Sequence, residues 1–222
     1  MNKFKEAIKK QAYYENFITR SIKSSNAIEG NTLSYAETYS IVFNDESLPL
    51  QNVNPRELYE AINLKYALNY SLENQDKFDN GLIIKINEYI NKNIKETTGY
   101  RKGKVFIKGA DFVPEPPENV PNSMNELLYQ YNNSELPIIE RIADYHIRFE
   151  HIHPFEDGNG RTGRVIINHE LIRNNEIPIV IPEERRIEYF NYLQNYDTKG
   201  LTKMIKELQQ IEENKINEYE DN

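Results

Sequence analysis

The sequence has 222 residues, with 27 basic and 35 acidic side chains and a formal net charge of −8. This length favours one globular domain with a sizeable core. The acidic balance removes the broad electrostatic attraction that nucleic acids and anionic membranes need, so we expect neither as a partner. Because the sequence contains no cysteine, it excludes disulfides, thiolate nucleophiles and Cys-ligated metal clusters.

The N-terminal segment, MNKFKEAIKKQAYYENF, interrupts every apolar run with charged residues. It therefore has neither the apolar core of a signal peptide nor the length of a membrane span. The lack of cysteine fits a reducing compartment. We expect a cytoplasmic protein.

Helical spacing of apolar residues dominates the chain. The first predicted helix covers residues 4–28 and stops at Gly30, and the second covers residues 35–43. Further helices are predicted at 56–74, 82–94, 122–131, 136–150, 161–174, 183–195 and 201–220. The Pro-bounded apolar run at residues 177–182 is expected to be an extended connection. The pattern predicts an all-α fold in a single helical domain.

One segment, residues 97–121, breaks the helical pattern because it is rich in glycine and proline. Its β-prone run Val105–Ile107 predicts a small β-hairpin flap at about residues 99–117. The pair Gly103-Lys104 superficially suggests a phosphate-binding P-loop. The spacing and the residue after the lysine are wrong for that motif, so we exclude it.

The segment HPFEDGNGRTGR, residues 153–164, concentrates chemical groups between two predicted helices. Its glycines allow close approach of the backbone, and a following helix N-terminus would direct free N–H groups at an anion. Arg161 and Arg164 share one face of the first turn, which favours a phosphate ligand. Asp157 is suited to Mg²⁺ and His153 to accepting a proton. A glycine-rich turn with solvated charges would explain Gly-Asn-Gly alone, but not this whole composition.

These twelve residues resemble the core motif of Fic domains, HPFxxGNGRxxR with Asp or Glu at the second x. The resemblance implies a Fic fold and transfer of AMP from ATP to a Ser, Thr or Tyr hydroxyl of a target protein. It places the Fic catalytic domain at residues 34–222. By position it makes His153 the general base and Asp157 the ligand of Mg²⁺.

The remaining motif positions acquire roles through the same resemblance. Arg161 and Arg164 would engage the outer phosphates of ATP, and Phe155 would point into the core and anchor the loop. The backbone hole for the anion would be formed by Gly158, Asn159 and Gly160.

A second resemblance lies in Ser25–Gly30, with the sequence SNAIEG, which is similar to the inhibitory pattern of Fic proteins. It implies that Glu29 pairs with Arg164 and occupies the space of the γ-phosphate of ATP. Residues 1–33 would then form an N-terminal inhibitory helix region. The alternative is a helix that ends at Gly30 with an exposed glutamate.

The flap, residues 99–117, is similar to the hairpin that covers the nucleotide in Fic proteins, and it would dock the target protein by strand addition. Its tip would lie near the ribose and phosphates, with Lys108, Gly109, Ala110 and Asp111. Tyr189 or Phe190 would contact the adenine, and Asp197 the ribose or adenine. Ordinary packing is the alternative for these aromatic rings.

The other three histidines, His146, His151 and His169, are interpreted as packing residues, because no further ligand completes a metal site with the His151–His153 pair. Apolar, Tyr-rich helices could support a homodimer.

The resemblance as a whole predicts a Mg²⁺-dependent protein adenylyltransferase that Glu29 inhibits and that can also modify itself. Removal of AMP from a modified protein, on the same site, remains an alternative. A non-catalytic, nucleotide-responsive regulatory module is a third hypothesis. The complete motif argues against it, since a binding module has no need of the base at His153.

Overall fold

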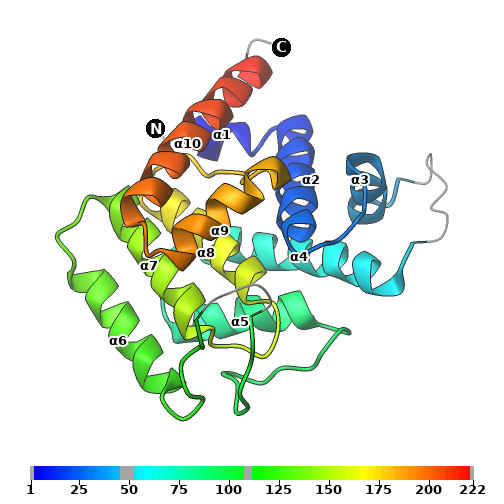
Figure 1. The fold of residues 1–222 in the computed structure, drawn as a ribbon. Coiled ribbons are helices and arrows are strands. Elements are labelled where there is room, and N and C mark those ends of the chain that lie inside the picture. Colours follow the sequence, from blue (N-terminus) through cyan, green and yellow to red (C-terminus); the bar gives the residue numbers. More distant parts are fainter. Residues whose placement is uncertain (1–2, 46–52, 108–111, 221–222) are drawn as a thin grey trace.

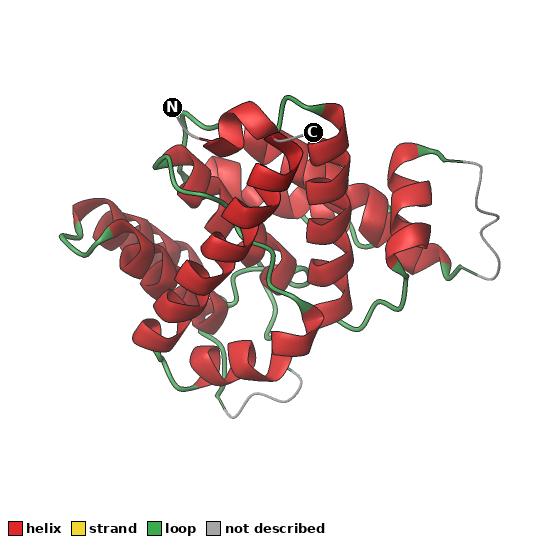
Figure 2. Ribbon diagram, turned by 90° about the horizontal axis from the view of Figure 1, so that it is seen from above, coloured by secondary structure: helices red, strands yellow, loops and turns green. Residues whose placement is uncertain are grey.

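The structure is a computed structural model that describes residues 3–45, 53–107 and 112–220. These residues form ten α-helices and one short 3-10 helix, and none of them lies in a β-strand (Figures 1 and 2). The prediction of an all-α fold is therefore confirmed.

The helices follow the predicted order, with shifts of a few residues at their ends. They are α1 Lys3–Ala7, α2 Gln11–Ile28, α3 Tyr35–Phe43, α4 Pro55–Glu73, α5 Asn80–Asn91, α6 Val120–Asn133, α7 Ile138–Ile152, α8 Asn159–Arg173, η1 Glu183–Arg185, α9 Arg186–Gln194 and α10 Thr198–Glu220.

The predicted first helix, residues 4–28, is divided into α1 and α2. The ring of Phe4 packs edge-on against Phe17, with centroids 5.0 Å apart, and against Tyr13 at 6.1 Å. This aromatic contact requires the chain to turn back at residues 8–10. Tertiary packing therefore overrides a helical pattern that is continuous in the sequence.

Polar caps fix the helix starts that follow the α2 segment. Ser34 and Glu37 form a reciprocal capping box at the start of α3. Asn54 caps α4, which has Pro55 as its first residue, and Asp79 caps α5. These caps determine the residues at which α3, α4 and α5 begin.

Helix α8 is the central helix of the domain, and thirteen of its fifteen residues are buried. It packs against α7, α5, α4 and α2, and lies beside α7 in Figure 1. Two buried polar residues in its second half are hydrogen-bonded to neighbouring helices: His169 meets the hydroxyl of Ser71 at 3.1 Å, and Glu170 accepts from Tyr131 at 2.6 Å. The first two turns of α8, which carry Arg161 and Arg164, are therefore held by packing on all sides.

The described legs of the flap, residues 99–107 and 112–117, are loops that contain bends, and neither leg forms a strand. Pro114, together with the two prolines that follow Glu115, removes backbone donors that a strand ladder requires. The predicted β-hairpin is thus not formed by these legs, and the tip residues 108–111 lie outside the described residues.

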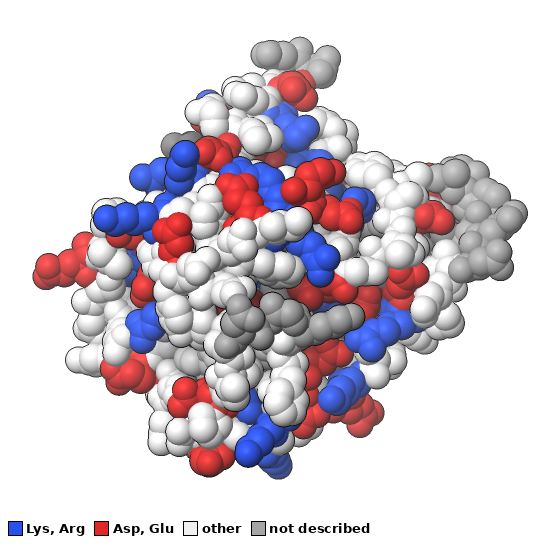
Figure 3. Space-filling view, in the orientation of Figure 1, with Lys and Arg blue, Asp and Glu red and all other residues white. Residues whose placement is uncertain are grey.

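Acidic and basic side chains intermingle on the face shown in Figure 3. Among the described helices, none combines the length and the apolar character needed to cross a bilayer.

Candidate active site

His153 terminates α7 in the left-handed conformation, with φ 51°. Its amide donates to the carbonyl of Phe149 at 2.9 Å, and its Nδ1 lies 3.2 Å from the carbonyl of Glu150. Because a carbonyl can only accept, Nδ1 carries the proton, and Nε2 of the neutral ring is the acceptor. This orientation leaves Nε2 to take a proton from another molecule.

Burial lowers the pKa of His153 to about 4, an effect that the neighbouring charge of Arg101 reinforces. The imidazole is therefore neutral near pH 7. A neutral imidazole in a fixed tautomer is the form that acts as a general base.

The turn after His153 is stabilised by its own side chains. Asn159 accepts from the amide of Phe155 and donates to the carbonyl of the same residue, both at 2.8 Å. Phe155 is 1% exposed and packs on Tyr100 at 5.6 Å, so its predicted anchoring position is confirmed. Because the Asn159 side chain is committed to the turn, only its backbone amide is available to an anion.

Gly158 forms the N-cap of α8 with φ 76°, a conformation that favours glycine. A Cβ atom here would lie 2.9 Å from Ile90 and 3.2 Å from the Asn87 side chain. Asn87 and Asn91 instead hold the preceding carbonyl of Asp157, at 2.9 and 3.0 Å. The first turn of α8 thus begins in a fixed position, with N–H groups that have no acceptor within the helix.

Asp157 belongs to a closed ring of four alternating charges. It pairs with Arg56 at 3.0 Å and with Arg161 at 3.5 Å, while Glu60 pairs with the same two arginines at 3.1 and 3.4 Å. Arg161 is buried, whereas the Arg56 side chain is 57% exposed. Arg56 is therefore the cation in this ring that can withdraw into solvent.

The residues around Asp157 fit Mg²⁺ only in company with a phosphate ligand. Among the described residues, no group of three or more His, Cys, Asp or Glu side chains could hold a metal ion. One carboxylate combined with substrate phosphates is, however, the usual way in which proteins bind Mg²⁺. An incoming Mg²⁺ would compete with Arg56 for the carboxylate of Asp157.

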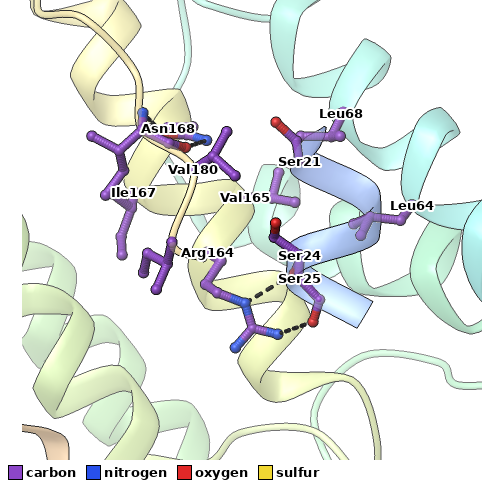
Figure 4. A pocket seen from close by; sticks show the side chains of 12 residues that line it. Ser21, Ser24, Ser25, Leu64, Leu68, Arg164, Val165, Ile167, Asn168 and Val180 are labelled. Carbon is purple, nitrogen blue, oxygen red and sulfur yellow. Dashed lines mark hydrogen bonds between the residues drawn. The ribbon is translucent and has the colours of Figure 1, made fainter. Parts of the chain in front are cut away.

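Arg164 is the cation that joins α8 to the end of α2. It is 7% exposed, and it donates to the hydroxyl and carbonyl of Ser25, each at 2.9 Å (Figure 4). It also donates to the carboxylate of Glu29 at 2.7 Å. Gly160 makes room for this pair, since a Cβ there would clash with the Glu29 carboxylate. The structure pairs Glu29 with Arg164, as the resemblance implied, and places Ser25 beside the same arginine; Gly30 follows the end of α2 with φ 97°.

Desolvation raises the pKa of Glu29, but the charge and hydrogen bond of Arg164 lower it by more, so the pKa lies below its ordinary value. Glu29 is therefore an anion near pH 7. The Nη1 group of Arg164 and the Nε group of Arg161 are buried and have no hydrogen-bond acceptor among the described residues. Buried donors of this kind indicate a site built for an anion.

A cavity of about 30 Å³ lies behind Arg164, between α2 and α8 (Figure 4). Ser21, Ser24 and Ser25 line its α2 side, and Asn168 lines its α8 side. Its volume suffices for a water molecule or two but not for a nucleotide. The face of α2 that meets α8 is thus small, polar and incompletely packed.

The residues proposed near the adenine lie in different environments. Tyr189 is fully buried, and its hydroxyl meets Nε2 of His146 at 2.6 Å, as ordinary packing would require. Phe190 is 36% exposed and keeps surface available for a base. Asp197 accepts from the amide of Gly200 at 2.8 Å and so caps α10. Lys108, Gly109, Ala110 and Asp111 lie outside the described residues.

The three remaining histidines are packing residues, as expected. His146 is buried, and burial lowers its pKa to about 3. His169 is also buried and bonded to the carbonyl of Lys77 at 2.7 Å. His151 lies between two aromatic rings, of Phe112 and Tyr196, each with a centroid distance of 3.8 Å.

Sequence analysis overlooked one buried acid beside the base. Glu150 is 7% exposed, and its Oε2 lies 3.8 Å from Nδ1 of His153. Burial raises the pKa of Glu150 to about 8, although the charge of Arg164 opposes this effect. The signal was available, because Glu150 falls on the face of α7 that otherwise carries buried residues.

Known proteins share this sequence and this arrangement of helices. A profile of the Fic/DOC family matches residues 77–171. A curated relative from Nematostella vectensis, named "Protein adenylyltransferase Fic", is 31% identical over 224 residues, which cover 97% of this chain and 50% of the relative. The chain therefore spans half the length of this relative, and less of several insect relatives with the same name.

Two solved structures extend the similarity to the fold. A Fic domain-containing signaling protein from Bacteroides thetaiotaomicron superposes with a TM-score of 0.74 and 25% identity, covering 92% of this chain and 90% of that one. A Fic family protein from Desulfovibrio desulfuricans gives 0.72 and 28%, with 89% and 63% covered. The twelve-residue motif, the profile match and the shared helical fold lead to one assignment. Residues 77–171 of this chain form a Fic/DOC domain.

Proposed function

We propose that this protein is an adenylyltransferase that moves AMP from ATP to a Ser, Thr or Tyr hydroxyl of a target protein, and that Glu29 inhibits it. One observation carries the proposal. A neutral His153, with Nε2 free to accept a proton, lies beside a helix N-terminus that carries two buried arginines. The names of the curated relatives support the same reaction.

In the proposed reaction the target hydroxyl attacks the α-phosphorus of ATP. A bond forms between the hydroxyl oxygen and phosphorus, the bond from phosphorus to the bridging oxygen breaks, and pyrophosphate leaves. Nε2 of His153 accepts the hydroxyl proton. Arg161, Arg164 and the first amides of α8 stabilise the negative charge of the departing phosphates. Mg²⁺, held by Asp157, would add positive charge at the same phosphates.

Inhibition in this proposal is a competition for one cation. Glu29 accepts from Arg164 at 2.7 Å and lies against Gly160, where a bound phosphate would need the same donors. ATP that binds beside Glu29 would be displaced from in-line geometry, and misplacement by about 1 Å can reduce a rate about 100-fold. The segment 1–33 thus acts as an inhibitory region, and residues 34–222 supply the catalytic groups.

The target protein would dock on the flap. Phe106 is 87% exposed and Val113 is 83% exposed, so the two described legs present apolar side chains beside the site. An extended target segment can pair with such a backbone while its side chains cover the apolar groups. Self-association as a homodimer remains a prediction, which sedimentation velocity would test.

The deciding experiment compares three proteins after incubation with ATP and Mg²⁺: the wild type, Glu29→Gly, and Glu29→Gly with His153→Ala. We expect intact-protein mass spectrometry to detect added AMP on Glu29→Gly alone. A lysate supplied with labelled ATP provides other targets. Failure of Glu29→Gly to label itself or any lysate protein would contradict the proposal.

Removal of AMP is the second candidate, because the Glu29 side chain is 37% exposed and its carboxylate lies at the anion site. A carboxylate in that position can accept a proton from an attacking water. The test uses labelled Glu29→Gly protein as substrate for the wild type. Release of AMP by the wild type, but not by a Glu29→Gly enzyme, would establish this reaction.

A further inference from the structure

Arg101, at the start of the flap, is 3% exposed, and its side chain donates to four backbone carbonyls. Nε donates to His153 at 2.7 Å, and Nη1 donates to Gly103 at 3.0 Å. Nη2 donates to Ile152 at 3.2 Å and also to Glu115. All four acceptors are neutral carbonyl groups, and no carboxylate accepts a hydrogen bond from this guanidinium among the described residues.

Only arginine can make this set of contacts. Its planar guanidinium offers five donors in a fixed fork, whereas a lysine ammonium offers three donors around one point. A buried charge is unfavourable unless hydrogen bonds replace its hydration. Burial lowers the pKa of Arg101. The four carbonyls therefore replace the water molecules that the Arg101 guanidinium loses on burial.

The four carbonyls come from three separate parts of the molecule. Gly103 belongs to the first leg of the flap and Glu115 to the second, while Ile152 and His153 end α7. The amide of Arg101 adds a further link, to the carbonyl of Pro154 at 2.9 Å. One residue thus connects both legs of the flap to the backbone on either side of the catalytic base.

His153 depends on such a link more than an ordinary residue would. Its φ of 51° is in the left-handed region, which non-glycine residues adopt rarely. Surrounding contacts must maintain a conformation of this kind. The 2.7 Å bond from Arg101 to its carbonyl, together with the bond from its amide to Phe149, fixes the peptide groups on both sides of its Cα.

We infer that Arg101 is a positioning residue: it orients the base through the His153 carbonyl and couples that orientation to the position of the flap. The inference rests on the proposed adenylyl transfer. It differs from a purely structural role in one respect. Loss of Arg101 should reduce the rate at saturating ATP much more than it reduces the affinity for ATP, because the phosphate-binding groups lie on α8.

The test compares Arg101→Met and Arg101→Lys, each in the Glu29→Gly background. Arg141→Met is the control, since it removes a partly buried arginine of α7 that donates to the carbonyl of Ser134, away from the site. Self-modification at saturating ATP gives the rate, and calorimetry with ATP and Mg²⁺ gives the affinity. Hydrogen exchange follows the amides of residues 101 and 153.

We expect Arg101→Met to lower the rate about 100-fold, with a change in ATP affinity of less than about threefold. Exchange at residues 101 and 153 should become faster by at least about tenfold, and Arg141→Met should change none of these values. Arg101→Lys keeps the charge without the fork, so it should recover only part of the rate. It also keeps the inference testable if Arg101→Met does not fold.

Three results would overturn the inference: an unchanged rate, a rate loss that equals the loss of ATP affinity, or full recovery by Arg101→Lys. If Glu29→Gly itself transfers no AMP, the proposed function fails. The exchange measurement then decides alone whether Arg101 holds the backbone of His153, and unchanged exchange would refute that.

Discussion

The catalytic turn and the end of α2 form two sides of one site, but they are held in different ways. The turn is fixed by many contacts: hydrogen bonds within its own segment, such as those of Asn159 with Phe155, hydrogen bonds from α5, and the ion pair of Asp157 with Arg56. Glu29 lies at the end of a helix, 37% exposed, and its described contact in the site is a single cation, Arg164. The catalytic turn is therefore preorganised, and Glu29 can leave the site without disturbing that turn.

The strongest test of the preorganised side removes the base itself. In the Glu29→Gly background, His153→Ala should reduce AMP transfer by about 10³-fold, because general base catalysis contributes on the order of 10²–10⁴. Folding should be little affected, since the His153 side chain makes one long hydrogen bond to a backbone carbonyl. The rate of mass increase measures the loss, and calorimetry with ATP serves as the control. A residual rate within about tenfold of the parent would refute the assignment.

The next test removes the bonds within the turn. Asn159→Ala should lower the free energy of unfolding by about 3 kcal/mol, because two hydrogen bonds are lost and the buried amide of Phe155 loses its acceptor. Urea denaturation measures this change. Asn191→Ala, on the exposed face of α9, should stay within about 0.5 kcal/mol. Equal losses for the two variants would mean that the turn is not stabilised as we describe.

The buried acid beside the base gives a test that depends on pH. The pKa of Glu150 rises from 4.5 to about 8 on folding, chiefly through burial, so the folded state binds the proton more tightly. The free energy of unfolding therefore contains a contribution from the protonated Glu150. This contribution is complete below pH 4.5, declines as the pH rises, and is lost above about pH 8. Glu150→Gln, which cannot ionise, should remove this decline.

We expect Glu150→Gln to exceed the wild type in stability by on the order of 2 kcal/mol at alkaline pH, with a smaller difference in acid. Urea unfolding measured at a series of pH values gives the slope. Glu156→Gln, at an exposed position of the turn that follows α7, is the matched control. Parallel pH profiles for wild type and Glu150→Gln would show that this carboxyl is not held neutral.

The contrast between the two sides also explains what could be read from the sequence. The motif is local, so the chain order of His153, Asp157 and Arg164 was enough to predict the groups of the turn. The pairing of Asp157 with Arg56 depends on where α4 lies in space. No spacing in the sequence reports a contact between residues 101 positions apart.

Neighbouring residues on α9 illustrate the same limit. Tyr189 and Phe190 differ by about 100° around a helix, so packing buries one and exposes the other. The helix has no pronounced apolar face that would reveal which of them is buried. The flap differs for another reason: its β-prone run at Val105 predicted a strand, but a strand needs a partner ladder, and the described opposite leg contains Pro114.

The smallest expected effect is a change in ATP affinity at Glu29, where the charge of the side chain can be removed while a hydrogen-bond acceptor is kept. Glu29→Gln retains a hydrogen-bond acceptor for Arg164 but loses its charge, and neutral hydrogen bonds are roughly half as strong as charged ones. Its affinity for ATP should rise about tenfold above the wild type and remain below that of Glu29→Gly. Calorimetry with ATP and Mg²⁺ measures the series, and Glu156→Gln should match the wild type. The effect of the charge should also show in the pH dependence. Desolvation raises the pKa of Glu29, but Arg164 lowers it by more, so the pKa lies below its ordinary value of 4.5. The ion pair of Glu29 with Arg164 is therefore complete above pH 4.5 and is lost only as the pH falls through the lowered pKa. The difference between wild type and Glu29→Gln should therefore persist from about pH 6 to 8. If ATP bound the two proteins equally, the carboxylate charge would play no part in excluding the phosphate, and the steric presence of the side chain beside Gly160 would be the sole basis of inhibition.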